Sequence, residues 1–336
     1  MILVTGGCGY IGSHTIVELL NSGKDVVVLD NLVNSSKISL ERITKITEKE
    51  PFFVYGDIQD EAILNKIFSD YDIESVIHFA GLKSVGQSND HALHYFNTNI
   101  GGTLNLLSCM EKAGIFKIIF SSSATVYGDD IKSPISENDP CGNTKNPYGT
   151  SKYAIERILN DLAFSNKKWT VVILRYFNPI GAHSSGLIGE DSSERPDNLM
   201  PFITKVAMEI LPFLEVYGAD YNTPDGSGIR DYIHILDLAS GHVKALDFTD
   251  NALGSHTFNL GTGNGYSVFE VIQSFKDVTN ITIPFKIAPR REGDIAISYA
   301  DVSKSKEHLK WEAKRNIKDM IKDTWNWQLR NPDGYE

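Results

Sequence analysis

Cysteine is scarce in this chain of 336 residues, and no long apolar run is present. The three cysteines, Cys8, Cys109 and Cys141, are widely spaced and odd in number, so neither a disulfide scaffold nor a zinc site is expected. No segment is long enough to form a transmembrane helix, and the apolar stretch at 2–4 is too short and lacks the basic flanks of a signal peptide. We expect free thiols and a cytoplasmic location.

Basic residues are also outnumbered, since 32 Lys and Arg stand against 43 Asp and Glu, giving a net charge of −11. This acidity argues against nucleic acids and membrane surfaces as partners. The 9 histidines show no metal-ligand spacing, so we expect no bound metal, and His78 is interpreted as a hydrogen-bonded core residue. A hydrophobic content of 41% fits a globular protein with one large domain and one smaller one.

The chain begins with a short apolar run, which is followed by a glycine-rich turn and then by a helical pattern. Gly7-x-Gly9-x-x-Gly12 matches the dinucleotide-binding fingerprint, and Gly6-x-x-Gly9-x-x-Gly12 overlaps it. Glycines let the backbone approach a pyrophosphate, and the helix N-terminus offers N–H groups to it. The next strand pattern ends at Asp30, whose carboxylate suits ribose hydroxyls and repels a 2′-phosphate. The sequence therefore predicts NAD rather than NADP.

Strand and helix patterns then alternate through the first half of the chain. Strands are expected at 25–29, 52–55, 75–79, 117–120 and 170–174, and helices at 13–20, 61–68 and 103–113. This alternation predicts an α/β fold, a Rossmann-type doubly wound parallel sheet with a smaller mixed α/β substrate domain. Loop residues dominate between Asn178 and Gly226. We therefore place the NAD-binding domain at 1–177, with a later return of the chain at about 230–262, and the substrate domain mainly at 178–336.

Polar and small residues follow several of the expected strands, at the sheet edge where ligands bind in such folds. Ser123 comes just after the strand at 117–120, whereas Asp57-Ile58 and the segment Phe79 to Lys83 follow two others. These segments are plausible walls for adenine and nicotinamide. For Asp57, an ordinary helix cap is an equally good interpretation.

Tyr148 and Lys152 are four residues apart in a helical pattern, so their side chains lie on one face, one turn apart. Asn146 can cap this helix, and Pro147 fits its first turn. A tyrosine, with an ordinary pKa near 10, needs about 4 kcal/mol of phenolate stabilisation to act as a base near pH 7. One cation at about 4 Å supplies roughly this much at an effective dielectric constant of about 20. We therefore expect Lys152 alone to lower the pKa of Tyr148 sufficiently, with Ser123 completing a catalytic trio.

Arginines occur in two separate loops of the second half, as Arg230 and as the pair Arg290-Arg291. Guanidinium groups make bidentate contacts with phosphate oxygens, so two such loops suit a diphosphate. For any single arginine, a surface salt bridge is the competing interpretation. Amide and aromatic contacts for a sugar or a base are offered by Asn178, Asn198 and Tyr217.

Eight segments together resemble one family, the UDP-glucose 4-epimerases, a group of the extended short-chain dehydrogenases/reductases. They run nearly from end to end of the chain, and several are specific to this group. The segments are Thr5 to His14, Asp30 to Leu32, His78 to Lys83, Ser121 to Gly128, Leu174 to Pro179, Asn198 to Pro201, Arg230 to His234 and Ala288 to Asp294.

The resemblance implies an NAD-dependent isomerase that interconverts UDP-glucose and UDP-galactose. Tyr148, held as phenolate by Lys152 and the nicotinamide charge, would take the proton of the sugar 4′-hydroxyl, with Ser123 as a hydrogen-bonding relay. Hydride would pass from C4′ to the nicotinamide, the 4′-keto sugar would turn over in the pocket, and hydride would return to its other face. A strong grip on UDP and a weak grip on the sugar would let this intermediate rotate without escaping.

The resemblance also assigns binding positions residue by residue. For the cofactor these are Gly6, Gly9, Tyr10, Ile11, Gly12, Asp30, Asn31, Asn34, Ser35, Asp57, Ile58, Phe79, Ala80, Lys83, Tyr148, Lys152 and Tyr176. For the UDP-hexose substrate they are Lys83, Ser123, Phe177, Asn178, Asn198, Leu199, Tyr217, Arg230, Arg291, Asp294 and Ser298, with the arginines on phosphate and Asp294 on ribose. A homodimer through the helices around 92–113 and 148–163 is implied by analogy.

Two positions depart from common members of the family. Tyr217 stands where many relatives carry phenylalanine beside the uracil, a change that keeps the stacking face. Ser298 stands where many bacterial relatives restricted to UDP-glucose and UDP-galactose carry a bulky tyrosine. We therefore expect room for a 2-acetamido group and activity on UDP-GlcNAc and UDP-GalNAc as well. The alternative is a neutral surface substitution, with Tyr299 filling the pocket.

Two rival functions are compatible with the fold. A sugar-nucleotide dehydratase shares the cofactor and the Tyr148/Lys152 pair, but such enzymes place Asp and Glu where this chain has Ala124 and Ser122 beside Ser123. A non-catalytic NAD-binding sensor would have no need to keep the catalytic trio intact. We therefore interpret the chain as an epimerase. The alternative with a narrower substrate range is an enzyme restricted to UDP-glucose and UDP-galactose.

Overall fold

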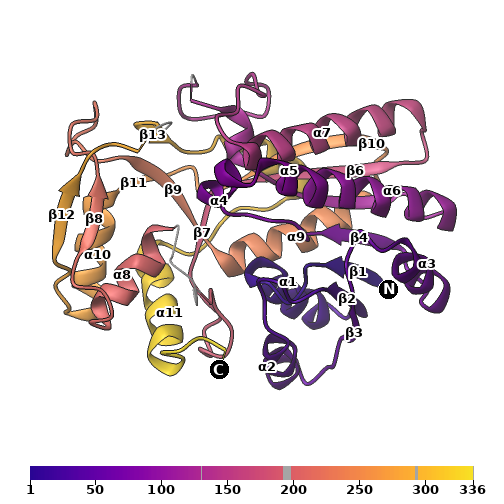
Figure 1. Ribbon diagram of the computed structural model, residues 1–336, viewed down its shortest axis with the longest axis horizontal. Helices are drawn as coiled ribbons and strands as arrows, with labels where there is room; N and C mark the ends of the chain where they lie inside the picture. The colour runs from indigo at the N-terminus through magenta and orange to yellow at the C-terminus, as the bar shows by residue number, and fades with distance from the viewer. Residues whose placement is uncertain (130, 192–197, 292–293, 336) are drawn as a thin grey trace.

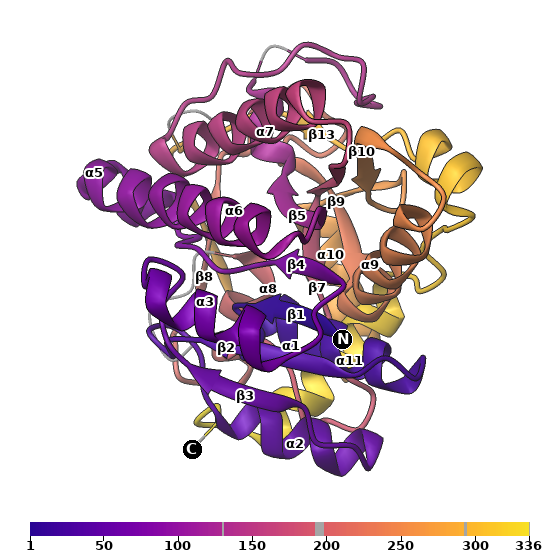
Figure 2. The same cartoon turned by 90° about the vertical axis from the view of Figure 1, so that its right-hand side faces the viewer.

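The computed structural model describes residues 1–129, 131–191, 198–291 and 294–335, and its centre is a seven-stranded parallel sheet. The strand order is β10-β6-β5-β4-β1-β2-β3 (Figures 1 and 2). The strands are β1 (Ile2–Thr5), β2 (Val26–Asp30), β3 (Phe52–Tyr55), β4 (Ser75–His78), β5 (Lys117–Ser123), β6 (Thr170–Tyr176) and β10 (Gly254–Leu260). The predicted α/β doubly wound fold is thus confirmed, and the strand order reverses between β1 and β4, where such sheets bind ligands.

Helices cover both faces of this sheet because successive strand residues point to opposite sides. Ile2 and Val4 pack toward α1 (Tyr10–Asn21), α2 (Ile38–Thr47) and α9 (Ile235–Thr249). Leu3, between them, packs toward α3 (Glu61–Asp70), α6 (Gly102–Ala113) and α7 (Pro147–Ser165). Each fully buried aliphatic side chain contributes about 1.5–3 kcal/mol to folding. The two apolar layers fix the sheet edge at which the predicted site residues lie.

A smaller group of elements lies beside the large sheet, at the left of Figure 1. Its strands are β7 (Asn178–Ile180), β8 (Leu214–Tyr217), β9 (Ile229–His234), β11 (Gly265–Ser267), β12 (Phe285–Ala288) and β13 (Ile297–Ser298). Its helices are α8 (Leu199–Ala207), α10 (Val268–Thr279) and α11 (Ile317–Arg330), which share an apolar core with these strands. The chain returns to the large sheet through α9 and β10, and β10 pairs with β6.

Helix α7 is anchored by a buried ion pair. Arg175 on β6 donates from Nε and Nη2 to Glu156 at 3.0 and 2.7 Å, and the two side chains are only 6% and 2% exposed. Ser122 Oγ donates to the same carboxylate at 2.5 Å. Because Glu156 lies one turn beyond Lys152, this pairing sets the rotation of α7 and directs Lys152 and Tyr148 toward the end of β5.

The three cysteines form no disulfide, which confirms the prediction of free thiols. Over the described ranges, no helix combines the length and apolar character needed to cross a membrane. Within the same residues, no group of three or more His, Cys, Asp or Glu side chains is arranged to hold a metal ion.

His78 is a hydrogen-bonded core residue, as its apolar setting predicted. Its Nδ1 lies 2.7 Å from Thr5 Oγ1 and its Nε2 lies 2.9 Å from Thr103 Oγ1. Burial lowers the pKa of His78 to about 3. The folded chain therefore binds one proton fewer than the unfolded chain between about pH 6.5 and this value, and stability is lost as the pH falls through that range.

Replacing His78 by glutamine is expected to make folding less sensitive to acid, since glutamine does not titrate and still offers a donor and an acceptor. Between pH 7 and pH 5, the wild-type free energy of unfolding should fall by about 2 kcal/mol more than that of the variant. Urea unfolding of both proteins at the two pH values measures the difference between their losses of stability. Contributions from other titrating groups are the same in both proteins and cancel. Equal losses in both proteins would show that the pKa of His78 does not differ between the folded and unfolded chains.

Candidate active site

The glycine-rich turn between β1 and α1 is shaped for close approach of a ligand backbone. A Cβ on Gly12 would lie 2.4 Å from Gly6 O, and Gly6 has a φ of +70° with Ala80 N only 2.7 Å from where its Cβ would be. Gly9 is the N-cap of α1 and offers no side-chain cap. The first N–H groups of α1 are therefore left to bind an anion, which suits a pyrophosphate.

Asp30 stands at the end of β2 with its carboxylate held in place. Its Oδ2 accepts from Cys8 N at 2.9 Å, and its Oδ1 accepts from Leu32 N at 2.9 Å and from Ser35 Oγ at 2.8 Å. A carboxylate has about four acceptor positions, so capacity for a ribose hydroxyl remains. The glycine turn and Asp30 together fit a dinucleotide. Ser35 was predicted to contact the cofactor, and in the structure its hydroxyl donates to Asp30 Oδ1.

Asp57 was open to two interpretations, and the helix-cap alternative is wrong. Helix α3 is capped by Asp60, whose side chain accepts from Ala62 N and Ile63 N. Asp57 instead accepts from Asn31 Nδ2 at 2.7 Å and from Gln59 N at 2.8 Å. The cap falls three residues later because α3 begins at 61, which leaves Asp57 on the wall of the cavity described next.

Most predicted site residues meet at one cavity of about 360 Å³ along the carboxyl edge of the sheet. Those lining it are Gly6, Gly9, Tyr10, Ile11, Gly12, Asp30, Asn31, Asn34, Asp57, Ile58, Phe79, Ala80, Lys83, Ser123, Tyr148, Lys152, Tyr176, Phe177, Asn178 and Asn198. The predicted residues outside its lining are Ser35, Leu199, Tyr217, Arg230, Arg291, Asp294 and Ser298. The cavity thus unites the predicted catalytic positions with all the predicted cofactor positions except Ser35, and it includes part of the predicted substrate set.

The catalytic trio lies at the junction of β5 and α7. Asn146 caps α7 by accepting from Gly149 N at 2.8 Å, and Pro147 is the first helical residue, as predicted. Lys152 Nζ donates to Ser121 O at 2.7 Å and lies 5.9 Å from the centre of the Tyr148 ring. Ser123 is the last residue of β5 rather than the first beyond it.

The expectation that Lys152 alone lowers the pKa of Tyr148 is wrong. Enclosure by protein raises the pKa of Tyr148 to about 12, and a hydrogen bond with Ser123 opposes this rise only in part. Burial also lowers the pKa of Lys152 to about 8. Because burial of the phenol disfavours its charged form, Lys152 alone does not bring the pKa of Tyr148 near neutral pH, and further stabilisation of the phenolate is needed for Tyr148 to act as a base there.

Asn99, which the sequence analysis did not single out, fixes the loop that follows β4. It lies in a π-helical segment, Phe96–Gly101, that leads into α6. Its Oδ1 accepts from Leu82 N at 2.8 Å, and its Nδ2 donates to Leu82 O at 3.1 Å and to Ser151 Oγ at 3.0 Å. The only sequence signal was a polar residue at a buried helical position, and π-helical segments often mark functional sites.

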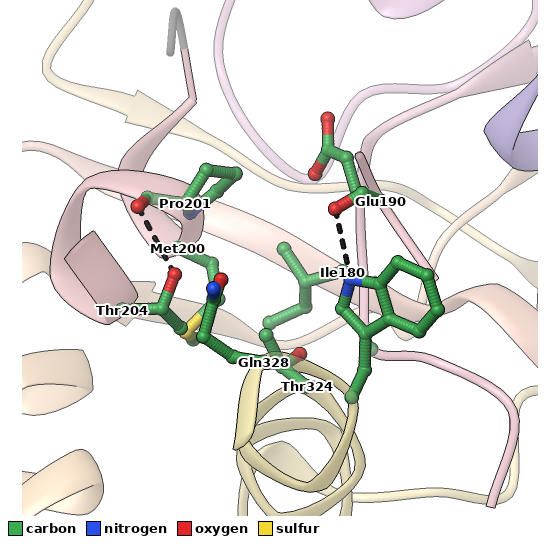
Figure 3. Close-up of a pocket in the computed structure, with 9 residues that line it drawn as sticks. Ile180, Glu190, Met200, Pro201, Thr204, Thr324 and Gln328 are labelled. Carbon is green, nitrogen blue, oxygen red and sulfur yellow. Dashed lines mark hydrogen bonds between the residues drawn. The ribbon is translucent and has the colours of Figure 1, made fainter. Parts of the chain in front are cut away.

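Glu190, also missed, places a carboxylate in the cavity wall. Its Oε1 lies 3.9 Å from Lys83 Nζ and accepts from Asn198 Nδ2 at 3.4 Å, and burial raises its pKa. Figure 3 shows its side chain pointing away from the hydrogen bond that its backbone oxygen accepts from Trp327. The small pocket drawn there has a volume of about 10 Å³, room for about one water molecule. Of these two pockets, the one that holds the trio is therefore the one large enough for a ligand.

The predicted arginine loops form a separate cluster. Arg230 Nη2 lies 3.3 Å from Asp294 Oδ1, and the guanidinium of Arg291 stacks 3.9 Å from the centre of the Tyr217 ring. Arg290 instead pairs with Asp220 at 2.8 Å, which matches the competing interpretation of a surface salt bridge. Glu292 and Gly293 of the same motif lie outside the described residues.

A doubly wound parallel sheet, a glycine turn and a Ser-Tyr-Lys trio in one cavity define an NAD-dependent enzyme of the short-chain dehydrogenase/reductase type. The chain matches the NAD dependent epimerase/dehydratase family over residues 2–261. It belongs to this family, and it is an NAD-dependent epimerase, an isomerase.

Individual proteins of known identity are similar over nearly the whole chain. The UDP-glucose 4-epimerase of Pasteurella multocida is 56% identical over 99% of both chains. The crystal structure of UDP-glucose 4-epimerase from Bifidobacterium longum with NAD+ and UDP has a TM-score of 0.96, with 51% identity over 99% of both chains. The UDP-Glc/GlcNAc 4-epimerase of Campylobacter jejuni has a TM-score of 0.86, with 34% identity over 98% of this chain and 99% of its own.

Proposed function

We propose that this enzyme interconverts UDP-glucose and UDP-galactose by transient oxidation at C4′ to a 4′-keto sugar and reduction of the opposite face. The observation that carries the proposal is the meeting of Tyr148, Lys152 and Ser123 with the glycine turn in one cavity. The names of the relatives in Pasteurella multocida and Bifidobacterium longum, both UDP-glucose 4-epimerases, support the same substrate.

In this proposal, residues of the chain transfer the proton and bind the cofactor and the substrate. Tyr148 accepts the proton of the 4′-hydroxyl and later returns it to the reduced carbon's oxygen. Lys152, held by Ser121 O, stabilises the phenolate from the same helix face. NAD, when bound, would supply the acceptor and then the donor of hydride, and its nicotinamide charge would add to the stabilisation of the Tyr148 phenolate. Gly6, Gly12 and Asp30 would hold this cofactor.

The substrate half of the proposal uses the arginine cluster. Arg230 and Arg291 would bind the diphosphate, Asp294 the ribose, and Tyr217 would stack on the uracil, whereas Asn178 and Asn198 already line the cavity. The stacking of Arg291 on Tyr217 supports this arrangement, since a guanidinium so placed is preorganised for phosphate. The phosphates and the nucleoside would thus be held firmly while the sugar is free to rotate.

We further propose activity on UDP-GlcNAc and UDP-GalNAc. Ser298 is 9% exposed on β13, in register with Arg230 on β9, so it is a buried residue next to a predicted phosphate contact. Tyr299 follows it in the chain and lies against Gly265. Because neighbouring strand residues point to opposite sides, Tyr299 is not expected to fill the space beside Ser298. The Campylobacter jejuni relative, named for both sugar types, supports the broader range.

A dehydratase is the second candidate, since the family name includes such enzymes. Elimination of water requires an added acid and base next to the trio. Ala124 offers neither, and the hydroxyl of Ser122 is committed to Glu156. These two residues favour the epimerase.

We also propose a cytoplasmic homodimer. The unpaired cysteines fit a reducing compartment. Leu93 on α5 (Ala92–Tyr95) is 78% exposed and Leu104 on α6 is 47% exposed, and these helices lie alongside α7 in Figure 2. Exposed apolar residues on adjacent helices are typical of subunit interfaces.

The test of the proposed function is to incubate the purified protein with UDP-galactose, without added cofactor, and to follow the products by NMR. Appearance of UDP-glucose is expected, because tightly held NAD is regenerated in each turnover. A product lacking the 6′-hydroxyl would indicate the dehydratase. Retention of NAD with no turnover of any UDP-hexose would indicate a sensor.

A further inference from the structure

The hydroxyl of Ser123 lies between the catalytic phenol and two donors that belong to one residue. Thr125 N donates to Ser123 Oγ at 3.2 Å, and Thr125 Oγ1 donates to the same oxygen at 3.0 Å. Ser123 also acts on Tyr148, since its hydroxyl opposes the rise in the pKa of the phenol that burial causes. All three residues line the large cavity, so this arrangement lies at the reacting end of the site.

The hydrogen-bonding capacity of a serine limits what Ser123 can do in this arrangement. A hydroxyl has one proton to donate and two lone pairs that accept. Thr125 fills both accepting positions, so the single proton of Ser123 remains for the oxygen of Tyr148. A hydroxyl that accepts two hydrogen bonds is also the stronger donor, because hydrogen bonds in a chain polarise one another.

We propose that Thr125 is a positioning residue that fixes Ser123 as a donor to the phenolate oxygen of Tyr148. The hydrogen bonds then share one direction: Thr125 donates to Ser123, and Ser123 donates to Tyr148. Resting on the proposed function, this assignment sends the 4′-hydroxyl proton directly to Tyr148: the sugar O–H bond breaks as the phenol O–H bond forms. Ser123 therefore does not act as the relay that the family resemblance implied, since it has no free lone pair to receive a proton.

A simpler role for Thr125 would be structural. Its N–H caps the short 3-10 turn Ala124–Tyr127 through Ser123 Oγ, and this contact needs only the backbone. The side-chain hydroxyl is not required for the cap. Thr125→Val keeps the backbone contact and the shape of the side chain but removes the second donor, whereas Thr125→Ser keeps the donor. The pair of variants separates the two roles.

The experiment compares the wild type, both variants and Thr279→Val, a control in which the lost hydroxyl donates to Phe275 O and accepts from Ile281 N at the end of α10. Thr125→Val is expected to lower kcat on UDP-galactose about tenfold with KM unchanged, because Ser123 loses one of its two donors, stabilises the phenolate less, and leaves a smaller fraction of Tyr148 ionised. The acid limb of kcat should move to higher pH, and Thr125→Ser should restore both. Thr279→Val should match the wild type.

Ultraviolet titration of Tyr148, taken as the difference from Tyr148→Phe, gives a readout that needs no turnover. The tyrosinate signal of Thr125→Val should appear at higher pH than that of the wild type. An unchanged titration curve, or a lower melting temperature with unchanged kcat, would overturn the proposal. Should the wild type fail to convert UDP-galactose, the proposed function would fall while the titration still decides the role of Thr125.

Discussion

Tyr148→Phe is expected to lower kcat on UDP-galactose by about a thousandfold, since the variant lacks the phenol that takes the 4′-proton in the proposed mechanism. The aromatic ring remains on the first turn of α7, which Asn146 caps, so the helix itself is not disturbed. KM should change little, because the predicted UDP contacts come from the arginine cluster and the amides. Steady-state kinetics at several pH values measure the effect.

Tyr153→Phe is the matched control for this variant. Tyr153 lies on the same helix but does not line the cavity. It should keep kcat within about twofold of the wild type, as expected for a change away from the reacting atoms. Both variants should melt at the same temperature as the wild type. A Tyr148→Phe enzyme that keeps a tenth or more of its kcat would show that another group removes the proton.

Ser298→Tyr is expected to remove activity on UDP-GalNAc while sparing UDP-galactose. The added ring would occupy the space assigned to the 2-acetamido group, and steric exclusion of this kind changes kcat/KM by about a hundredfold. Activity on UDP-galactose should stay within about threefold, because that sugar has only a hydroxyl at C2′. Parallel assays with the two substrates measure the ratio.

Ser298→Ala serves as the control, since it keeps the position small and should retain both activities. An equal loss of both activities in Ser298→Tyr would indicate general damage to the lobe around β9 and β13. A wild type inactive on UDP-GalNAc would restrict the enzyme to UDP-glucose and UDP-galactose and leave the mechanism at Tyr148 intact.

The parts of the fold that the sequence predicted are those governed by local rules. The glycine turn after β1 follows from short contacts that only glycine tolerates, as between Gly12 and Gly6 O. The start of α7 follows from Asn146 and Pro147, whose capping roles are local. The alternation of apolar strands and helices then predicted a single fold class, because the connections between parallel strands are almost always right-handed.

The missed features depend on contacts between distant segments. Asn99 joins the loop after β4 to α7, and Glu190 meets Lys83 and Asn198 across the cavity. No spacing within a single segment could reveal these partners. The pKa of Tyr148 was misjudged for a related reason, because the sequence shows that a lysine is near but not how far burial opposes ionisation. Thr125 is two residues from Ser123, but the sequence does not show that its hydroxyl donates to Ser123 Oγ, because this contact depends on how the turn folds.

An isotope experiment shows most directly whether C4′ is oxidised and then reduced within one closed site. UDP-galactose carrying deuterium at C4′ would be converted in ordinary water by the purified protein without added cofactor, and the product analysed by NMR. The account predicts UDP-glucose that keeps its deuterium at C4′, because the same hydride returns to the same carbon. Loss of the label to solvent would contradict it, since that result requires removal of a C4′ proton by a base instead of hydride transfer.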